Sequence, residues 1–192
     1  MVAVGKAGVA YCLRKAAPGS DGGQTFELRR LGKTIAYNTA ANCWPGWGDA
    51  GVVIEDAQIR DGIELAARCR ELVHELSLTP REAGGADWLV GALQLAVHEY
   101  KAAQEAFEQA ERAFASDDDL LPYALMARGY VALAQKSDPQ GRKQGSDALD
   151  KVLEQLRAEG SDDGMFFANQ IATADRVFNE ERGVRQSYLG ER

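Results

Sequence analysis

Apolar residues recur every three or four positions through most of this chain, which is the spacing of one face of an α-helix. In the segment 56–76, for example, Ile59, Ile63 and Val73 fall on one stripe. Similar stripes, separated by short breaks, predict helices over residues 26–43, 56–76, 88–98, 100–114, 120–134, 146–157 and 165–178. No segment shows a convincing strand pattern. We therefore expect an all-α protein of seven helices, in which the short breaks make neighbours antiparallel.

The first 25 residues carry a weaker pattern than the rest of the chain. Residues 8–16 can form a short helix, and residues 17–24 have the composition of a turn or linker. We expect residues 1–25 to be flexible or weakly ordered and residues 26–180 to form a single domain. Residues 181–192 are expected to be a frayed C-terminal tail.

Small and aromatic residues repeat along the predicted helices. Three sets of residues show this repetition. In chain order they are Leu28, Leu31, Gly32 and Ile35; then Gly91, Ala103, Phe107 and Ala110; and then Tyr123, Met126, Ala127 and Tyr130. This pattern resembles the tetratricopeptide-repeat (TPR) family, with three degenerate repeats over residues 26–158 and a capping helix over 165–180. The resemblance implies antiparallel helical hairpins stacked as a short superhelix.

The chain also departs from the family pattern. Asp87 stands where the family often has tryptophan, and Trp88 follows one residue later. Only the middle repeat has the ordinary length, because the interval between the paired helices is much longer in the first repeat and moderately longer in the third. A generic α-helical bundle is therefore the alternative to a TPR-like array.

The first insertion contains the segment N-C-W-P-G-W-G-D at residues 42–49. Large exposed aromatic side chains are costly, so Trp44 and Trp47 need a role. One interpretation is that they fold back and cover the open N-terminal end of the superhelix, because stacked repeats need such a cap. The other is that the Pro-Gly turn presents the indole rings to a peptide or a small ligand. A dimer contact is the third.

Charge and composition narrow the partners of the protein. The 192 residues carry a formal net charge of −7, which argues against nucleic acid or an anionic membrane as the main partner. The three cysteines have no Cys-x-x-Cys spacing, so we expect neither a disulfide framework nor a thiolate metal site. No apolar stretch is long enough for a signal-peptide core or a membrane span, and we predict a cytoplasmic protein.

Catalytic and metal-binding patterns are lacking in the sequence. Neither His74 nor His98 has a histidine or cysteine three or four residues away. No segment matches a nucleophile elbow, a zinc-protease motif or a phosphate-binding loop. We expect no enzyme activity, no metal and no cofactor.

The TPR resemblance also implies where a partner would bind, because the first helix of each hairpin lines a concave groove in that family. By register, the candidate groove residues are Arg29, Lys33, Tyr37, Trp88, Leu95 and Arg128. For Arg29, Lys33 and Arg128 a solvated helix face is the alternative. The family's clamp for a terminal carboxylate is not expected, because leucines such as Leu89 and Leu121 occupy several of its positions.

We therefore predict a non-catalytic scaffold or adaptor module that binds a peptide or partner protein in a concave helical groove. The alternative is a small-ligand sensor or enzyme accessory subunit, with an aromatic pocket formed by Trp44 and Trp47. The last helix, with Phe166 and Val177, has more apolar surface than one face can bury. A homo-oligomer through this helix is also predicted.

Overall fold

The structure is a computed structural model that describes residues 1–16 and 22–180. Within these ranges every regular element is helical, which confirms the predicted all-α fold class. The α-helices are α1 (Val2–Lys15), α2 (Gly22–Ala41), α3 (Asp56–Glu75), α4 (Pro80–Ala96), α5 (Tyr100–Phe114), α6 (Leu121–Ser137), α7 (Arg142–Glu159) and α8 (Asp162–Asp175). Two 3₁₀ turns, η1 (Pro45–Trp47) and η2 (Asp118–Leu120), and a π-helical turn, η3 (Arg176–Glu180), complete the elements.

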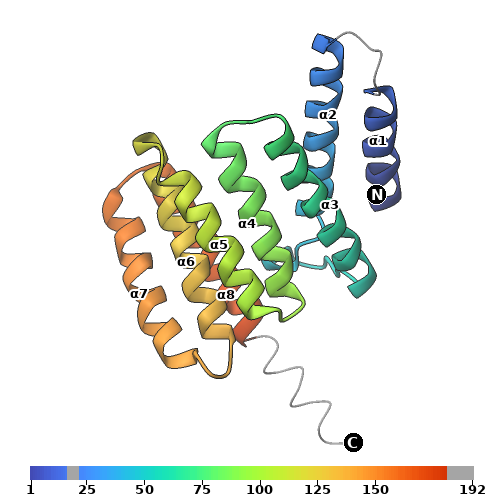
Figure 1. Ribbon diagram of the computed structural model, residues 1–192. Helices are drawn as coiled ribbons and strands as arrows, with labels where there is room; N and C mark the ends of the chain where they lie inside the picture. Colours follow the sequence, from blue (N-terminus) through green and yellow to red (C-terminus); the bar gives the residue numbers. More distant parts are fainter. Residues whose placement is uncertain (17–21, 181–192) are drawn as a thin grey trace, which may run out of the picture.

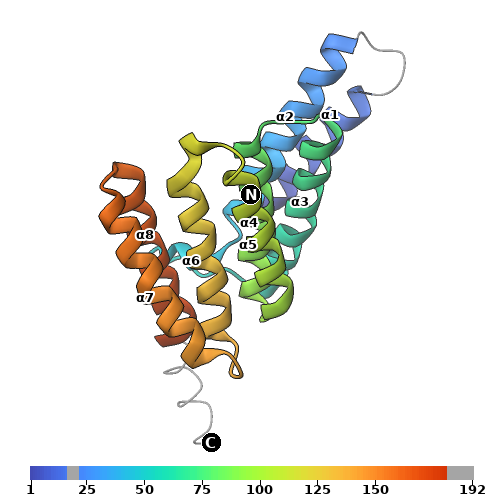
Figure 2. The ribbon, with the colours of Figure 1, turned by 60° about the vertical axis from the view of Figure 1, so that its left-hand side comes forward.

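The helices lie side by side in the order of the chain (Figure 1). Each helix from α1 to α8 packs against the next one, so neighbours in the chain are also neighbours in space. Contacts two places apart also form, from α2 to α4, from α4 to α6 and most extensively from α6 to α8. In Figure 2 the helices α7 and α8 close one end of the row, and α1 and α2 stand at the other.

The N-terminal segment differs from its prediction. Residues 2–15 form helix α1 and are not weakly ordered, and residues 22–25 belong to α2. The buried residues of α1, namely Val2, Gly5, Val9 and Cys12, follow a helical period that glycine partly conceals. A Cβ atom on Gly5 would lie 2.3 Å from Thr39 Oγ1, so this glycine lets α1 approach α2 closely. The linker residues 17–21 and the predicted tail 181–192 lie outside the described residues.

Helix α4 begins eight residues earlier than the sequence pattern predicts. The Thr79 hydroxyl caps its first turn by accepting a hydrogen bond from the Glu82 backbone nitrogen at 3.3 Å, and Pro80 follows at a position where no donor is needed. Gly84 lies inside the helix, where a Cβ atom would come within 2.6 Å of the Phe114 ring. The glycine pair that suggests a break therefore serves close packing against α5.

A second close approach follows the repeat pattern. A Cβ atom on Gly91 would lie 2.7 Å from the ring of Phe107, whose side chain is fully buried between α4 and α5. The paired small and aromatic residues thus meet as the sequence pattern implies. None of the helices in the described part of the chain combines the length and the apolar character needed to cross a lipid bilayer.

Candidate functional site

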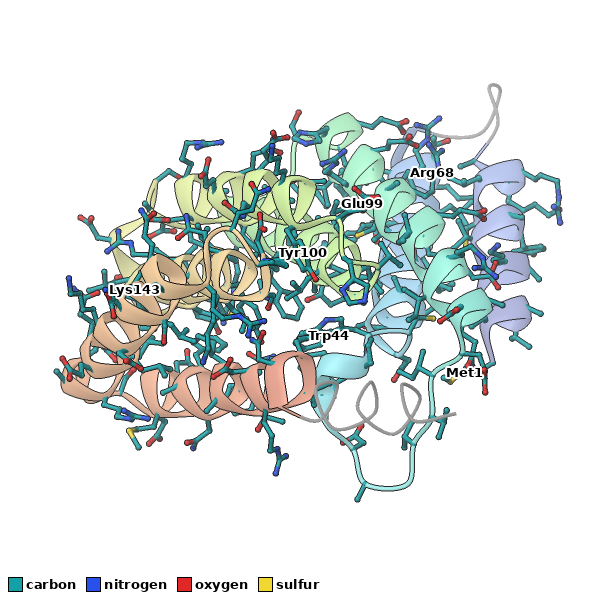
Figure 3. The ribbon with its side chains drawn as sticks, turned by 90° about the horizontal axis from the view of Figure 1, so that it is seen from below. Met1, Trp44, Arg68, Glu99, Tyr100 and Lys143 are labelled. Carbon is teal, nitrogen blue, oxygen red and sulfur yellow. The ribbon has the colours of Figure 1, made fainter. Side chains whose placement is uncertain are left out.

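The tryptophan-containing insertion turns into the interior of the molecule. The Trp44 side chain is completely buried, and its ring packs edge-to-face on Trp47 and Trp88, with centroid distances of 4.7 and 5.3 Å. Trp44 lies in the middle of the molecule in Figure 3. The turn η1 contacts α4, α8 and η3, so the insertion does not cover the N-terminal end. An exposed platform of two indole rings is also excluded, because Trp44 has no exposed surface.

Local sequence explains how the insertion makes this turn. Pro45 starts η1, and the Trp47 indole nitrogen donates a hydrogen bond of 2.7 Å to the carbonyl of Ala41 at the end of α2. A Cβ atom on Gly46 would overlap the Trp44 ring at 2.2 Å. Gly48 has a φ of +68°, a conformation that favours glycine. The two glycines are therefore required by the fold of the insertion.

The aromatic cluster continues through the core to α6 and η3. Tyr130 lies 5.8 Å from Trp44 and 5.4 Å from Trp88 between ring centroids, and Phe178 lies 6.3 Å from Trp44. Burial raises the pKa of the Tyr130 hydroxyl well above its ordinary value, so this group stays neutral. The Trp44 Nε1, Trp88 Nε1 and Tyr130 hydroxyl groups are buried and have no hydrogen-bond partner in the protein. Such groups are uncommon, because most buried polar groups in folded proteins have a hydrogen-bond partner.

A pocket of about 340 Å³, which we call the interhelix pocket, opens beside this cluster. Its wall consists mainly of ring-bearing and apolar side chains from α2, η1, α4, α5, α6 and α8, together with a few polar ones. These residues are Lys33, Tyr37, Trp47, Arg81, Glu82, Gly85, Trp88, Phe114, Tyr123, Met126, Phe166, Phe167 and Gln170. A mainly apolar wall with a few polar groups is typical of binding pockets, whose volumes start near 300 Å³.

Polar groups occupy defined places in the interhelix pocket. Lys33 Nζ donates a hydrogen bond of 2.8 Å to Glu82 Oε1, and both side chains are largely buried. Burial by itself would raise the pKa of Glu82, but the hydrogen bond and charge of Lys33 outweigh it and lower that pKa. Burial raises the pKa of Tyr37 to about 12, so its hydroxyl is neutral. The Oε1 atom of Gln170 is buried without a partner.

Three of the six predicted groove residues, Lys33, Tyr37 and Trp88, line this pocket. The other three lie elsewhere, and the prediction is corrected for them. Leu95 is 1% exposed in the core, Arg29 forms an ion pair with Glu75 of α3 at 2.5 Å, and Arg128 pairs with Glu111 of α5 at 2.7 Å. Arg29 therefore links α2 to α3, and Arg128 links α6 to α5.

Several lining residues are not among the predicted site residues. Arg81 falls in the break that the sequence pattern predicts before residue 88, although its position next to Pro80 is compatible with a first helical turn. Phe167 follows Phe166 in α8, the helix for which the sequence shows an excess of apolar residues. The ring centroids of Phe167 and Tyr123 lie 4.8 Å apart. The predicted dimer residues Phe166 and Val177 do not share a surface, because Phe166 lines the interhelix pocket and half-buried Val177 lines a different hollow.

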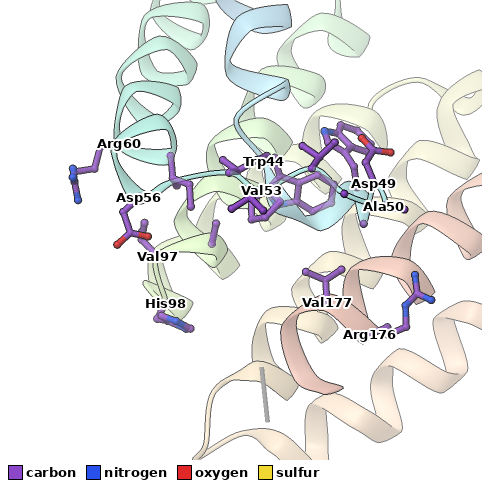
Figure 4. Close-up of a pocket in the computed structure, with 18 residues that line it drawn as sticks. Trp44, Asp49, Ala50, Val53, Asp56, Arg60, Val97, His98, Arg176 and Val177 are labelled. Carbon is purple, nitrogen blue, oxygen red and sulfur yellow. The ribbon is translucent and has the colours of Figure 1, made fainter. Parts of the chain in front are cut away.

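That second hollow, which we call the loop cavity, has a volume of about 870 Å³, and residues 48–54 form part of its wall. Figure 4 shows Val97 and His98 at one edge and Val177 at another, with Val53 of the loop between them. Charged residues at its boundary include Asp49, Asp56, Arg60 and Arg176. Val53 itself is 69% exposed. Trp47 lines both hollows, so they meet at the same aromatic cluster.

The reactive residue types do not gather at either hollow. Among the described residues, no three histidine, cysteine or acidic side chains are close enough together to hold a metal ion. The Cys43 thiol is buried and donates a hydrogen bond of 3.2 Å to the Thr39 carbonyl. Burial raises the pKa of Cys43 and raises that of Cys69 to about 11, so both stay protonated and are poor nucleophiles at neutral pH.

The chain was also compared with known proteins. No protein-family model, no curated protein and no solved structure matches it. The functional interpretation therefore rests on the geometry of the two hollows.

Proposed function

We propose that this protein is a non-catalytic interaction module, in which a TPR-like array of hairpins binds a partner protein through an anchor side chain. The helices α2, α4, α6 and α8 act as the groove-lining helices, and the interhelix pocket receives the anchor. The observation that carries the proposal is the composition of this pocket. It draws side chains from all four of these helices, including Lys33, Tyr37 and Trp88 from the predicted groove.

The free surface next to the pocket supports a protein partner. Phe166 lines the pocket and is 59% exposed, and its neighbour Met165 is 46% exposed. Exposed apolar side chains beside a pocket are typical of protein interaction sites, where a central anchor is surrounded by further contacts. The contact region is short, because the insertion with Trp44 fills the space between α4 and α8. An anchor in one pocket therefore fits the site better than a long bound helix.

Polar groups at the pocket favour a peptide over a hydrocarbon ligand. Lys33, Arg81, Glu82 and Gln170 line the pocket beside the apolar side chains. A peptide group carries one acceptor and one donor, so it can form hydrogen bonds with such polar groups, which a hydrocarbon cannot do. The three buried free cysteines suit the reducing cytoplasm that we propose for this module.

Gly85 offers a test that fills the pocket without damage to the fold. It lines the pocket inside α4, and a Cβ atom there would lie 3.9 Å from Tyr37, which is an ordinary contact. Gly85→Leu should block the pocket, while Gly85→Ala leaves most of it open. Both variants should be more stable than the wild type by up to about 1 kcal/mol, because glycine disfavours helices.

The measurement compares the partners that each folded variant captures from a lysate of the source cells, followed by titration of each captured partner. Gly85→Leu should weaken binding at least tenfold, and Gly85→Ala should bind as the wild type does. If Gly85→Leu keeps its partners at unchanged affinity, the interhelix pocket is not the anchor site. The matched alanine variant guards against an indirect effect of helix stability.

The loop cavity supports a second proposed function, a small-ligand sensor or an accessory subunit of an enzyme. Its volume of about 870 Å³ lies within the range of small-molecule sites, and Trp44 and Trp47 contribute to its wall. A screen of small molecules by thermal shift tests this function. A ligand of the loop cavity should stabilise the wild type and Gly85→Leu equally. A stabilisation that is lost in Gly85→Leu would instead assign the ligand to the interhelix pocket.

A further inference from the structure

The interhelix pocket carries one positive charge that the protein does not neutralise. Its charged lining residues are Lys33, Arg81 and Glu82, and Lys33 is paired with Glu82. Within the described residues Arg81 forms no ion pair with a carboxylate. Its guanidinium carbon lies 4.4 Å above the ring of Tyr123, and it donates a hydrogen bond to the Tyr123 hydroxyl. An uncompensated cation at this pocket contrasts with the net charge of −7 of the chain.

We propose that the interhelix pocket recognises an acidic segment of a partner protein that contains a tryptophan. The tryptophan side chain enters the pocket, and the carboxylate of a neighbouring residue binds Arg81. This inference rests on the proposed anchor function and adds the chemistry of the partner.

Ring-bearing walls explain the aromatic part of the partner. Seven of the lining residues carry aromatic rings, namely Tyr37, Trp47, Trp88, Phe114, Tyr123, Phe166 and Phe167. Such walls bind a planar ring through edge-to-face and offset contacts. Tryptophan has the largest ring of the aromatic residues, so it makes the most contact with these walls in a pocket of about 340 Å³.

The position of Arg81 explains the acidic part. Arg81 follows Pro80 in the first turn of α4, and Tyr123 lies in the first turn of α6. The partial positive charge of these helix ends favours an anion at the same edge of the pocket. Stacking on Tyr123 holds the guanidinium in place, so little side-chain freedom is lost on binding. A single unpaired arginine suits a carboxylate, whereas phosphorylated residues are usually bound by clusters of arginines.

Short blocked peptides can test both parts of the proposal. The probes are acetyl-Asp-Trp-Ala-amide, the Asn-Trp-Ala and Asp-Phe-Ala analogues, and a phosphoserine-Trp-Ala analogue. The chain has three tryptophans, so a ¹H–¹⁵N NMR spectrum contains three indole signals. The Trp47 and Trp88 signals can be assigned with Trp47→Phe and Trp88→Phe and report on the pocket directly.

We expect the Asp-Trp-Ala peptide to shift the Trp47 and Trp88 indole signals and to bind about three- to tenfold more tightly than Asn-Trp-Ala at low ionic strength. Arg81→Met keeps an apolar stem without the charge, and it should abolish this preference. Arg128→Met is the matched control, because Arg128 pairs with Glu111 and does not line the pocket. The control should keep the full preference.

Three results would overturn the inference in different ways. Equal affinity for the Asp and Asn peptides, or a preference that survives Arg81→Met, removes the acidic contact and leaves the anchor pocket intact. A phosphoserine peptide that binds far more tightly than the Asp peptide replaces the carboxylate by a phosphate. Equal binding of the Asp-Phe-Ala peptide removes the choice of tryptophan. Failure of every peptide to shift the two indole signals contradicts both this inference and the proposed anchor function.

Discussion

The interhelix pocket and the loop cavity share Trp47 but differ in how they are built. Side chains of five α-helices and η1 line the interhelix pocket, and two of its three charged lining residues, Lys33 and Glu82, are joined in an ion pair. Much of the loop cavity is lined by the irregular segment 48–54, in which Gly48 and Gly51 have positive φ angles. The smaller hollow therefore has walls held by helix packing, whereas the larger one depends on a few backbone conformations.

This difference indicates which hollow can bind with selectivity. A ligand loses least free energy on binding when the groups that contact it are already in place. The interhelix pocket meets this condition for its aromatic walls and for Arg81 on Tyr123. The loop cavity has a larger volume, and much of its wall is the segment 48–54, which contains no α-helix. Substitutions that act on one hollow and spare the other can test this distinction.

Loss of Trp44 should have the largest effect, because this side chain supports both hollows. Trp44 has no exposed surface and contacts Trp47, Trp88 and Tyr130. We expect Trp44→Ala to lower the free energy of unfolding by about 3–5 kcal/mol. Trp47→Ala should cost about 2 kcal/mol, because Trp47 is only half-buried and its loss mainly opens the hollows.

Urea unfolding of the two variants beside the wild type measures this difference. A cost for Trp44→Ala below that of Trp47→Ala would contradict the central role of the buried ring. Such a result would indicate that helix packing, and not the Trp44 ring, stabilises the aromatic cluster.

Gly48→Ala should damage the loop cavity with the second largest effect. An alanine at φ +68° is strained, and its Cβ atom would lie 2.7 Å from Thr173 Cγ2 of α8. We expect a loss of about 2–3 kcal/mol in the free energy of unfolding. Peptide binding in the interhelix pocket should stay unchanged.

Gly51→Ala is the matched control for this substitution. Gly51 also has a positive φ, +78°, but a Cβ atom there meets nothing within 4 Å. It should cost only about 1 kcal/mol, from strain alone. Equal losses for the two variants in the same urea titrations would mean that contact with α8 does not hold the loop.

These contrasts also mark how far the sequence could predict the structure. Helices such as 56–76 were predictable because their buried faces, including Ile59 and Val73, keep a helical period. The TPR resemblance implies six groove residues, and three of them, Lys33, Tyr37 and Trp88, line the interhelix pocket. The period of a single helix is a local property, and the sequence pattern reports it well.

Features that depend on contacts between distant segments were not predictable. Gly84 and Gly85 looked like a break, but Gly84 makes room for Phe114 of the next helix. The TPR register places Arg29 and Arg128 in the groove, but each forms an ion pair with a neighbouring helix. Arg29 pairs with Glu75 of α3, and Arg128 pairs with Glu111 of α5. The burial of Trp44 depends on rings contributed by α4, α6 and η3, and nothing in the segment 42–49 specifies these partners.

Lys33→Met should have a moderate effect on stability that depends on pH. Lys33 lowers the pKa of Glu82 below its ordinary value of 4.5 in the folded protein. The pair therefore contributes stability that is fully present above about pH 4.5 and is lost as the pH falls through the lower, folded-state pKa. We expect Lys33→Met to lose about 1–2 kcal/mol at pH 7 and less at acidic pH.

Melting temperatures of the wild type and Lys33→Met between pH 3 and 7 measure this effect. Their difference should shrink toward the acidic end. A difference that stays constant with pH would show that Lys33 acts through its apolar stem and not through Glu82.

Substitutions of Phe166 and Val177 should have the smallest effect on the free energy of unfolding. Phe166 is 59% exposed, so Phe166→Ser should change this free energy by no more than about 0.5 kcal/mol. If the protein self-associates through α8, sedimentation should detect a dimer that Phe166→Ser weakens and Val177→Ser does not, because the two residues border different hollows. In that case a second copy competes with partner peptides for the interhelix pocket. If the wild type stays monomeric at high concentration, Phe166 is available to contact the partner protein. Phe166→Ser should then weaken only peptide binding.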